Sequence, residues 1–150
     1  MQRVVRAHVD VVTDAGVERA GEIGAGLCVL VGVAHTDDVT LADKLADKIW
    51  HLRILDDADG VMNDSLARRH DAGLPTAVLL VSQFTLYGDT DRGRRPSWVD
   101  AARPEHAEPL VDRVAERLRV LGAEVATGRF RTEMYVELVN DGPVTLMLEV

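Results

Sequence analysis

Residues 76–86 read TAVLLVSQFTL, an apolar run that becomes polar as it ends. An uninterrupted run of valine and leucine is typical of a strand buried in the middle of a sheet. Ser82, Gln83 and Thr85 then add hydrogen-bonding groups at the edge of the core. If the strand continues to Leu86, Ser82 and Phe84 face one way while Gln83 and Thr85 face the other. The stretch therefore predicts a central strand with a polar end.

Other strands are predicted from β-branched runs and from alternation of apolar and polar residues. They cover residues 4–12, a second strand after a turn at 13–16, and residues 27–34, 133–139 and 144–150. One helix is predicted to follow a cap at Asp37 or Asp38, and another to run from Pro104 to Gly122. Strands outnumber helices, so we predict an α+β fold with a curled, largely antiparallel, barrel-like sheet and two main helices.

The length of 150 residues predicts a single domain, residues 1–150, with its own core. One cysteine, Cys28, excludes an internal disulfide, and its apolar surroundings LCVLVGV predict a buried, inert thiol. Neither a signal peptide nor a membrane-spanning run is recognisable, so we predict a cytoplasmic protein without a membrane partner. The net charge of −8 argues against broad binding to DNA or other nucleic acids.

The sequence lacks several common catalytic motifs: the GxSxG nucleophile elbow, the phosphate-binding P-loop and the zinc motif HExxH. The five histidines are scattered without ligand spacing, so no metal and no cofactor is predicted. Thr85 is a conceivable nucleophile, but no histidine or lysine lies nearby in sequence to activate it. On these residues alone, Ser82–Thr85 is interpreted as an ordinary strand end.

A second motif, NDGPVT at residues 140–145, is predicted to form a hairpin turn between the last two strands. The base rate for X-Pro bonds predicts a trans peptide between Gly142 and Pro143. A third feature is the basic cluster of Arg92, Arg94 and Arg95, which stands out against the acidic net charge. A solvated loop is the simplest interpretation of this cluster, and a local contact with RNA phosphates is the alternative.

Together, SQFTL and LVNDGPVT resemble the paired motifs of the bacterial D-aminoacyl-tRNA deacylases. The resemblance covers nearly the whole chain and includes QRVVRAHV, GEIGAGLCVLVGV, GRRPSW and TGRF. The chain departs from the family pattern at Tyr87-Gly88, where small apolar residues are common, and at Trp98, where phenylalanine is usual. These departures affect the pocket rim and leave both motifs intact.

The resemblance implies a cytoplasmic homodimer that hydrolyses the ester between a D-amino acid and the 3′ end of tRNA. It also implies removal of glycine mischarged on tRNA-Ala. Ser82, Gln83, Phe84 and Thr85 would line the active site. Residues of the second motif and its strand would bind substrate, with a cis Gly-Pro bond inserted into the neighbouring subunit's pocket: Gly142, Pro143, Met134 and Asn140.

The same resemblance implies catalysis without a side-chain nucleophile. The 2′-hydroxyl of the terminal ribose would assist, and backbone amides near the first motif would stabilise the oxyanion. A rigid gate would exclude L side chains by steric clash, and it would admit glycine. Three alternatives remain: a small esterase or thioesterase with Ser82 or Thr85 as nucleophile, a non-catalytic RNA- or small-molecule-binding domain, and a structural dimer.

Overall fold

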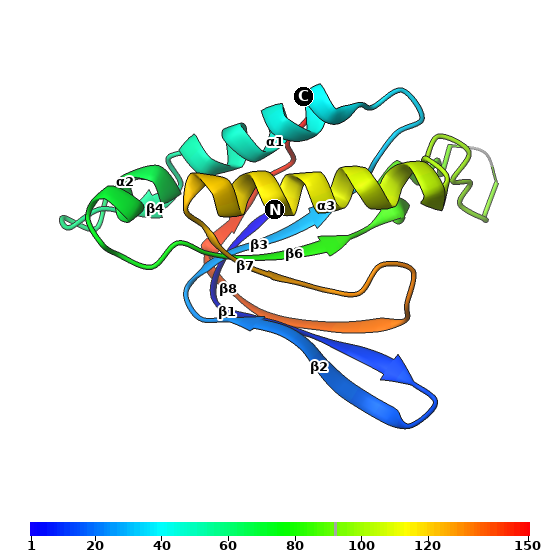
Figure 1. The fold of residues 1–150 in the computed structure, drawn as a ribbon, viewed down its shortest axis with the longest axis horizontal. Coiled ribbons are helices and arrows are strands. Elements are labelled where there is room, and N and C mark those ends of the chain that lie inside the picture. The colour runs from blue at the N-terminus through cyan, green and yellow to red at the C-terminus, as the bar shows by residue number, and fades with distance from the viewer. Residues whose placement is uncertain (92) are drawn as a thin grey trace.

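The computed structural model describes residues 1–91 and 93–150. They form a curled six-stranded sheet covered on one face by two helices (Figure 1), and a separate two-stranded sheet. The strand order is β2–β1–β3–β6–β7, and β8 pairs with the other edge of β1. These strands are β1 Gln2–Thr13, β2 Gly16–Ile23, β3 Gly26–Val31, β6 Ala77–Ser82, β7 Glu124–Thr127 and β8 Met134–Thr145. The remaining elements are α1 Val39–His51, β4 Leu55–Asp56, β5 Met62–Asp64, α2 Leu66–Asp71, the 3₁₀ turn η1 Phe84–Tyr87, and α3 Pro104–Leu121.

Strand β1 organises the sheet because it pairs along both of its edges. One edge pairs with β2 and β3 in succession and the other with β8, all antiparallel. The pairings β3–β6 and β6–β7 are parallel. The sheet curls until β2 meets β7, where a Cβ on Gly21 would lie 2.9 Å from the carbonyl oxygen of Thr127. The α+β class and the barrel-like curl of the sheet are thus confirmed.

The two main helices, α1 and α3, are also confirmed, and they run in the same direction side by side. Asp38 caps α1, its Oδ1 accepting a hydrogen bond from the Leu41 amide at 2.9 Å. Gly122 ends α3 in the left-handed region at φ 113°. Arg113 and Arg117 of α3 pair with carboxylates of α1, and buried apolar residues of both helices pack on the sheet. No helix in the described part of the chain is long and apolar enough to cross a bilayer.

The prediction of a strand through residue 86 was wrong, because β6 ends at Ser82. The amide of Gln83 still donates to the carbonyl oxygen of Val31 at 2.7 Å, but β3 also ends at Val31. With no neighbouring strand to continue the ladder, the chain turns into η1. The predicted alternation of side chains over residues 82–85 therefore does not occur.

The hairpin predicted at residues 140–143 was also wrong, because β8 runs through this segment to Thr145. The strand predicted for residues 144–150 is absent beyond Thr145. There, the main chains of Leu146 and Met1 exchange hydrogen bonds at 2.9 and 3.0 Å. Several short elements were not predicted because they offer too few residues for a periodic signal: β4, β5, β7 and α2.

The contact between β3 and β6 gives a testable prediction. A Cβ on Gly26 would lie 2.1 Å from the carbonyl oxygen of Ala77, a backbone atom that cannot move without displacing β6. We expect Gly26→Ala to lower the free energy of unfolding by about 3 kcal/mol in urea denaturation. Gly24→Ala is the matched control, since nothing lies within 4 Å of its Cβ. Equal stability of the two variants would contradict the close approach of β3 and β6.

Candidate functional site

A cavity of about 390 Å³ opens where β6 ends. Its walls come from the ends of β3 and β6, the turn η1, the first turns of α3 and three loops. They are mainly apolar, and they consist of Val31, Val33, Ser82, Gln83, Phe84, Trp98, Ala101, Ala102, Pro104, Ala107, Val111, Phe130 and Arg131. Three of the four predicted residues of the first motif therefore line one cavity. An apolar cavity with a few polar groups at one wall is typical of a small-molecule site.

The turn η1 leaves two backbone amides available beside this cavity. Leu86 donates to the carbonyl oxygen of Gln83 at 3.3 Å, and Gln83 itself donates to Val31. Within the described residues, the amides of Phe84 and Thr85 at the start of the turn have no hydrogen-bond acceptor. Consecutive free N–H groups of this kind bind an anionic oxygen.

Thr85, the fourth residue of the first motif, is exposed and lies outside the cavity wall. Its Oγ1 accepts a hydrogen bond from Gln83 Nε2 at 2.5 Å. Among the described residues that line the cavity there is no histidine and no carboxylate. A hydroxyl that accepts from an amide and lacks a neighbouring base is not activated as a nucleophile. Ser82 also lacks a neighbouring base, since the described residues that line its cavity include no histidine and no carboxylate.

Phe84 and Trp98 form an aromatic rim on the cavity. Their rings meet edge to face with centroids 5.7 Å apart, and Phe84 is 57% exposed. Trp98 follows a loop that is closed by mutual backbone hydrogen bonds between Asp89 and Ser97 at 2.7 and 2.9 Å. Arg94 and Arg95 lie on this loop and are exposed, whereas Arg92 lies outside the described residues.

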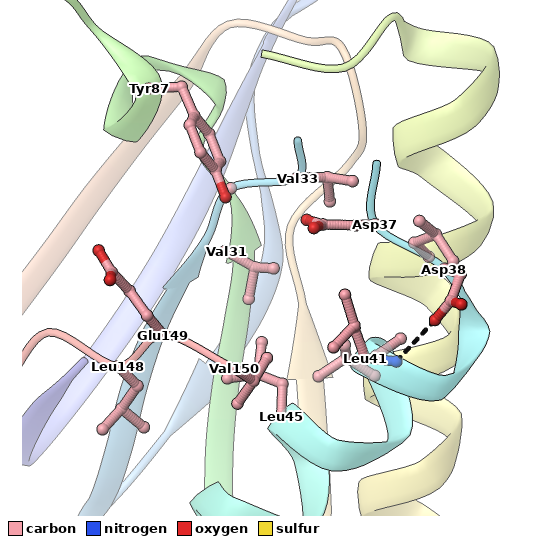
Figure 2. A pocket seen from close by; sticks show the side chains of 14 residues that line it. Val31, Val33, Asp37, Asp38, Leu41, Leu45, Tyr87, Leu148, Glu149 and Val150 are labelled. Carbon is pink, nitrogen blue, oxygen red and sulfur yellow. Dashed lines mark hydrogen bonds between the residues drawn. The ribbon is translucent and has the colours of Figure 1, made fainter. Parts of the chain in front are cut away.

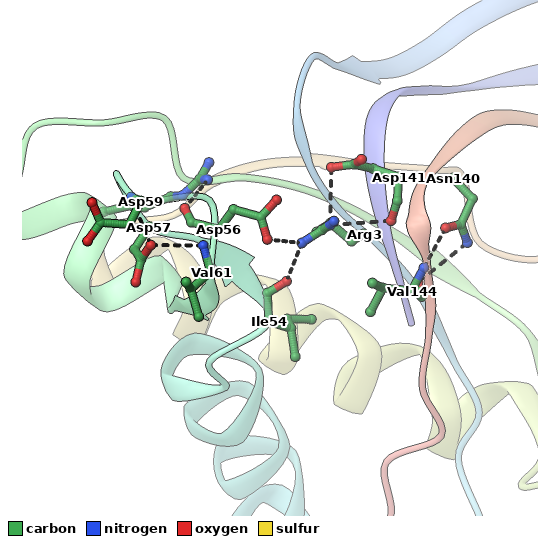
Figure 3. Close-up of polar contacts among 10 residues, drawn as sticks. Arg3, Ile54, Asp56, Asp57, Asp59, Val61, Asn140, Asp141 and Val144 are labelled. Atoms are coloured by element: carbon green, nitrogen blue, oxygen red, sulfur yellow. Dashed lines mark hydrogen bonds and ion pairs between the residues drawn. The ribbon is translucent and has the colours of Figure 1, made fainter.

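The second motif forms a bulge in the ladder between β1 and β8. Gln2 pairs with Thr145 and Val4 with Asn140, so β8 takes five residue steps where β1 takes two. Asn140 closes the bulge: its Oδ1 accepts from the Val144 amide at 2.8 Å (Figure 3). Its Nδ2 donates to Thr145 Oγ1 at 3.0 Å. The side chain of Asn140 is thus occupied in shaping the motif.

Gly142 and Pro143 lie in the extra part of this bulge and are exposed. The peptide bond between them is cis, as the family resemblance implied and contrary to the base-rate prediction. Gly142 has φ 120°, and a Cβ there would lie 2.7 Å from Val144 Cγ2 and 3.2 Å from Arg3 Nη2. The position therefore requires glycine for both its conformation and its space.

The side chain of Arg3, from β1, anchors the bulge (Figure 3). No pattern in the sequence distinguishes Arg3 from Arg6. Arg3 is 7% exposed, and its Nε lies 3.3 Å from the carbonyl oxygen and 3.1 Å from Oδ2 of Asp141. Its Nη1 donates to Asp56 Oδ1 at 2.6 Å and to the Ile54 carbonyl oxygen at 3.3 Å. A buried guanidinium with this many acceptors fixes the position of the bulge.

The structure does not bring the two motifs together. Val33, shortly before α1, lines the cavity, whereas Asp56, shortly after α1, contacts the Arg3 that holds the bulge. The thirteen residues of α1 span roughly 20 Å at about 1.5 Å per residue, and the two sites lie toward opposite ends of this helix. Met134 lies at the other end of β8 from Pro143, and a Cβ on Gly128 would meet both Met134 Sδ and Val81 Cγ1. Met134 is therefore on the Ser82 side of the molecule.

A second cavity, of about 370 Å³, lies between α1, the end of β3 and the C-terminal segment (Figure 2). Tyr87 points into it, and burial together with the charges of Asp37 and Glu149 raises the pKa of its hydroxyl. The phenol therefore stays protonated at neutral pH. No predicted site residue lines this cavity in the described structure. Cys28 is buried elsewhere in the core, and burial raises the pKa of its thiol, as expected of an unreactive cysteine.

Comparison with known proteins defines the class to which this fold and site belong. The family model described as D-Tyr-tRNA(Tyr) deacylase matches residues 1–149. A D-aminoacyl-tRNA deacylase of Symbiobacterium thermophilum is 56% identical over 149 residues, which are 99% of this chain and 93% of the relative. One from Neisseria meningitidis serogroup B is 53% identical over 149 residues, with coverages of 99% and 88%. The chain belongs to the D-Tyr-tRNA(Tyr) deacylase family.

Two solved structures share the fold of this chain. The c-Myc DNA Unwinding Element Binding Protein has a TM-score of 0.85 at 34% identity, covering 99% of this chain and 95% of the other. A probable eukaryotic D-amino acid tRNA deacylase has a TM-score of 0.73 at 17% identity, with coverages of 95% and 92%. The second likeness concerns the fold alone.

Proposed function

We propose that this protein hydrolyses the ester bond of D-aminoacyl-tRNA and releases the free amino acid and the tRNA. Residues 1–150 act as one catalytic domain, and a cytoplasmic location stays a prediction. The proposal rests on one observation: this chain belongs to the family, and it has two free amides, of Phe84 and Thr85, beside an apolar cavity. These amides suit the oxyanion that forms when water attacks an ester carbonyl.

The chemistry that we infer depends on positioning. The aminoacylated terminal adenosine enters the cavity, where Phe84 and the apolar wall exclude water from its non-reacting side. The 2′-hydroxyl of the terminal ribose assists the attacking water, and the Phe84 and Thr85 amides stabilise the developing charge. Gln83 orients the turn through its hydrogen bond to Thr85. The absence of a base among the described lining residues supports this scheme over a side-chain nucleophile.

Chiral selection is assigned to the exposed bulge at Gly142 and Pro143. The bulge lies roughly one helix length from the Ser82 cavity of its own chain, so we infer that it acts in the cavity of a second copy. Arg3 and Asn140 make the bulge rigid, and a rigid insert excludes an L side chain by steric clash. Glycine has no side chain to exclude and is also released. Met134 lies on the Ser82 side, where it would meet the inserted bulge.

The first test compares release of amino acid from tRNA charged with D-tyrosine, with L-tyrosine and with glycine. We expect rapid release of D-tyrosine and glycine, while the L-tyrosyl ester decays at its spontaneous rate. Equal release of both tyrosine enantiomers would identify an unselective esterase and reject the role of Gly142 and Pro143. Binding of tRNA without any release would identify a binding protein.

The second test separates the proposed scheme from a small esterase or thioesterase in which Thr85 is the nucleophile. We expect Thr85→Ala to lower kcat on D-tyrosyl-tRNA by less than about tenfold, because only one hydrogen bond is lost. Removal of a nucleophile typically costs a factor of about a thousand or more. Thr85→Ser is the control, since it keeps the hydroxyl. A loss of the larger size in the alanine variant, restored in the serine variant, would favour the esterase.

The third test mixes two inactive variants. Ala107→Phe fills the cavity from α3, and Gly142→Ala distorts the bulge. Each variant alone is expected to be inactive, whereas their heterodimer contains one intact cavity facing one intact bulge. After subunit exchange in equal amounts, we expect about a quarter of the wild-type activity. Heterodimers that form without any recovery, or a protein that sediments as a monomer, would contradict a site shared between two copies.

A further inference from the structure

Arg131 is the one charged residue among the described residues that line the Ser82 cavity. It follows Phe130 in the turn between β7 and β8, and it is exposed. The other lining residues are uncharged, and the net charge of the chain is −8. A cation placed at the edge of a neutral cavity indicates that a ligand carries negative charge at that edge.

The backbone of Arg131 is held in an unfavourable conformation. Its φ is 57°, and within the described chain it is the only residue other than glycine with a positive φ. The turn around it is closed by the hydroxyl of Thr132, which donates to the carbonyl oxygen of Arg129 at 2.9 Å. Glycine adopts this conformation without cost, whereas a long side chain does so only when the surroundings enforce it.

The guanidinium of Arg131 has no ion pair and no hydrogen bond to any described residue, in contrast to its neighbours. Arg129, two positions earlier, pairs with Glu18 of β2, and Arg19 pairs with Asp10 and Glu22. These two arginines are thus neutralised within the chain. Arg131 keeps all five of its donors available to a ligand at the cavity.

On the basis of the proposed function, we propose that Arg131 binds the phosphodiester that joins the terminal adenosine of the tRNA to the preceding nucleotide. When the aminoacylated adenosine fills the cavity, this phosphodiester is the first negative charge outside it. A guanidinium matches a phosphate with two parallel hydrogen bonds, which a lysine cannot reproduce. Arg131 is therefore a substrate-binding residue that recognises the nucleic-acid backbone and not the amino acid.

The experiment compares two substrates, D-tyrosyl-tRNA and 3′-O-D-tyrosyl-adenosine, which lacks the phosphodiester. Arg131→Gly removes the side chain and suits the left-handed backbone, so it is expected to fold. For this variant we expect kcat/KM on the tRNA to fall about tenfold through KM, with a salt dependence shallower by about 0.7 in log–log slope. Activity on the nucleoside ester is expected to stay at the wild-type level.

Two further variants serve as controls. Arg131→Lys keeps the charge and is expected to retain the salt slope while recovering part of kcat/KM on the tRNA. Arg129→Ala removes the same charge two residues away, where Glu18 already neutralises it, and is expected to match the wild type. An equal loss in Arg129→Ala and Arg131→Gly would indicate a general effect of net charge and overturn the specific contact.

Three other outcomes would overturn the proposed role of Arg131. An equal loss of Arg131→Gly activity on both substrates would show that Arg131 shapes the cavity, and no loss on either would show that it contacts nothing in the reaction. Conversion of Arg131→Gly to a monomer would assign the residue to the subunit interface. Each result overturns the inference while the proposed function stands. Failure of the wild type on both substrates would instead reject the proposed function, and with it this inference.

Discussion

The antiparallel pairing of β1 with β8 determines where the second motif lies. Two long strands held along most of their length leave one place for the surplus residues of β8, a bulge opposite Gln2–Val4. Arg3 comes from the paired segment of β1 itself, so the strand that forces the bulge also supplies the cation that holds it. Gln2 and Thr145 close the other side through Asn140. The shape of the motif thus follows from the ladder around it.

The first motif depends on a different constraint, the common end of β3 and β6. Because β3 offers no acceptor beyond Val31, β6 leaves the sheet after Gln83 and exposes two amides. Strand ends in a parallel pair are frequent ligand sites for this reason, since their backbone groups lack partners. The helix α3 then starts opposite the turn and supplies the apolar wall. The two free amides at this site therefore follow from the point where the pairing of β3 with β6 ends.

The sequence predicted the elements that have strong local signals. Asp38 and Gly122 marked a helix start and a helix end, and alternation marked β1 and β8. Prediction from the sequence failed where the end of a strand, or a bulge in it, depends on pairing with residues distant in the chain. The end of β6 depends on Val31, and the bulge at Gly142 depends on pairing with β1, so local patterns suggested a longer strand and a hairpin. Arg3 and Arg131 resemble surface arginines in sequence, and only burial in one case and a left-handed φ in the other distinguish them.

The separation of the two motifs along α1 determines how a defect in one chain affects the other chain. In the proposed dimer, a chain with a faulty bulge keeps a sound cavity of its own, and the defect appears in its neighbour. An intact copy assembled with such a chain loses its function although its own sequence is unchanged. In a cell that carries both forms, the fraction of inactive sites would equal the fraction of faulty chains, but many of those inactive sites would belong to intact chains. Selection then acts on the pair of chains as one unit.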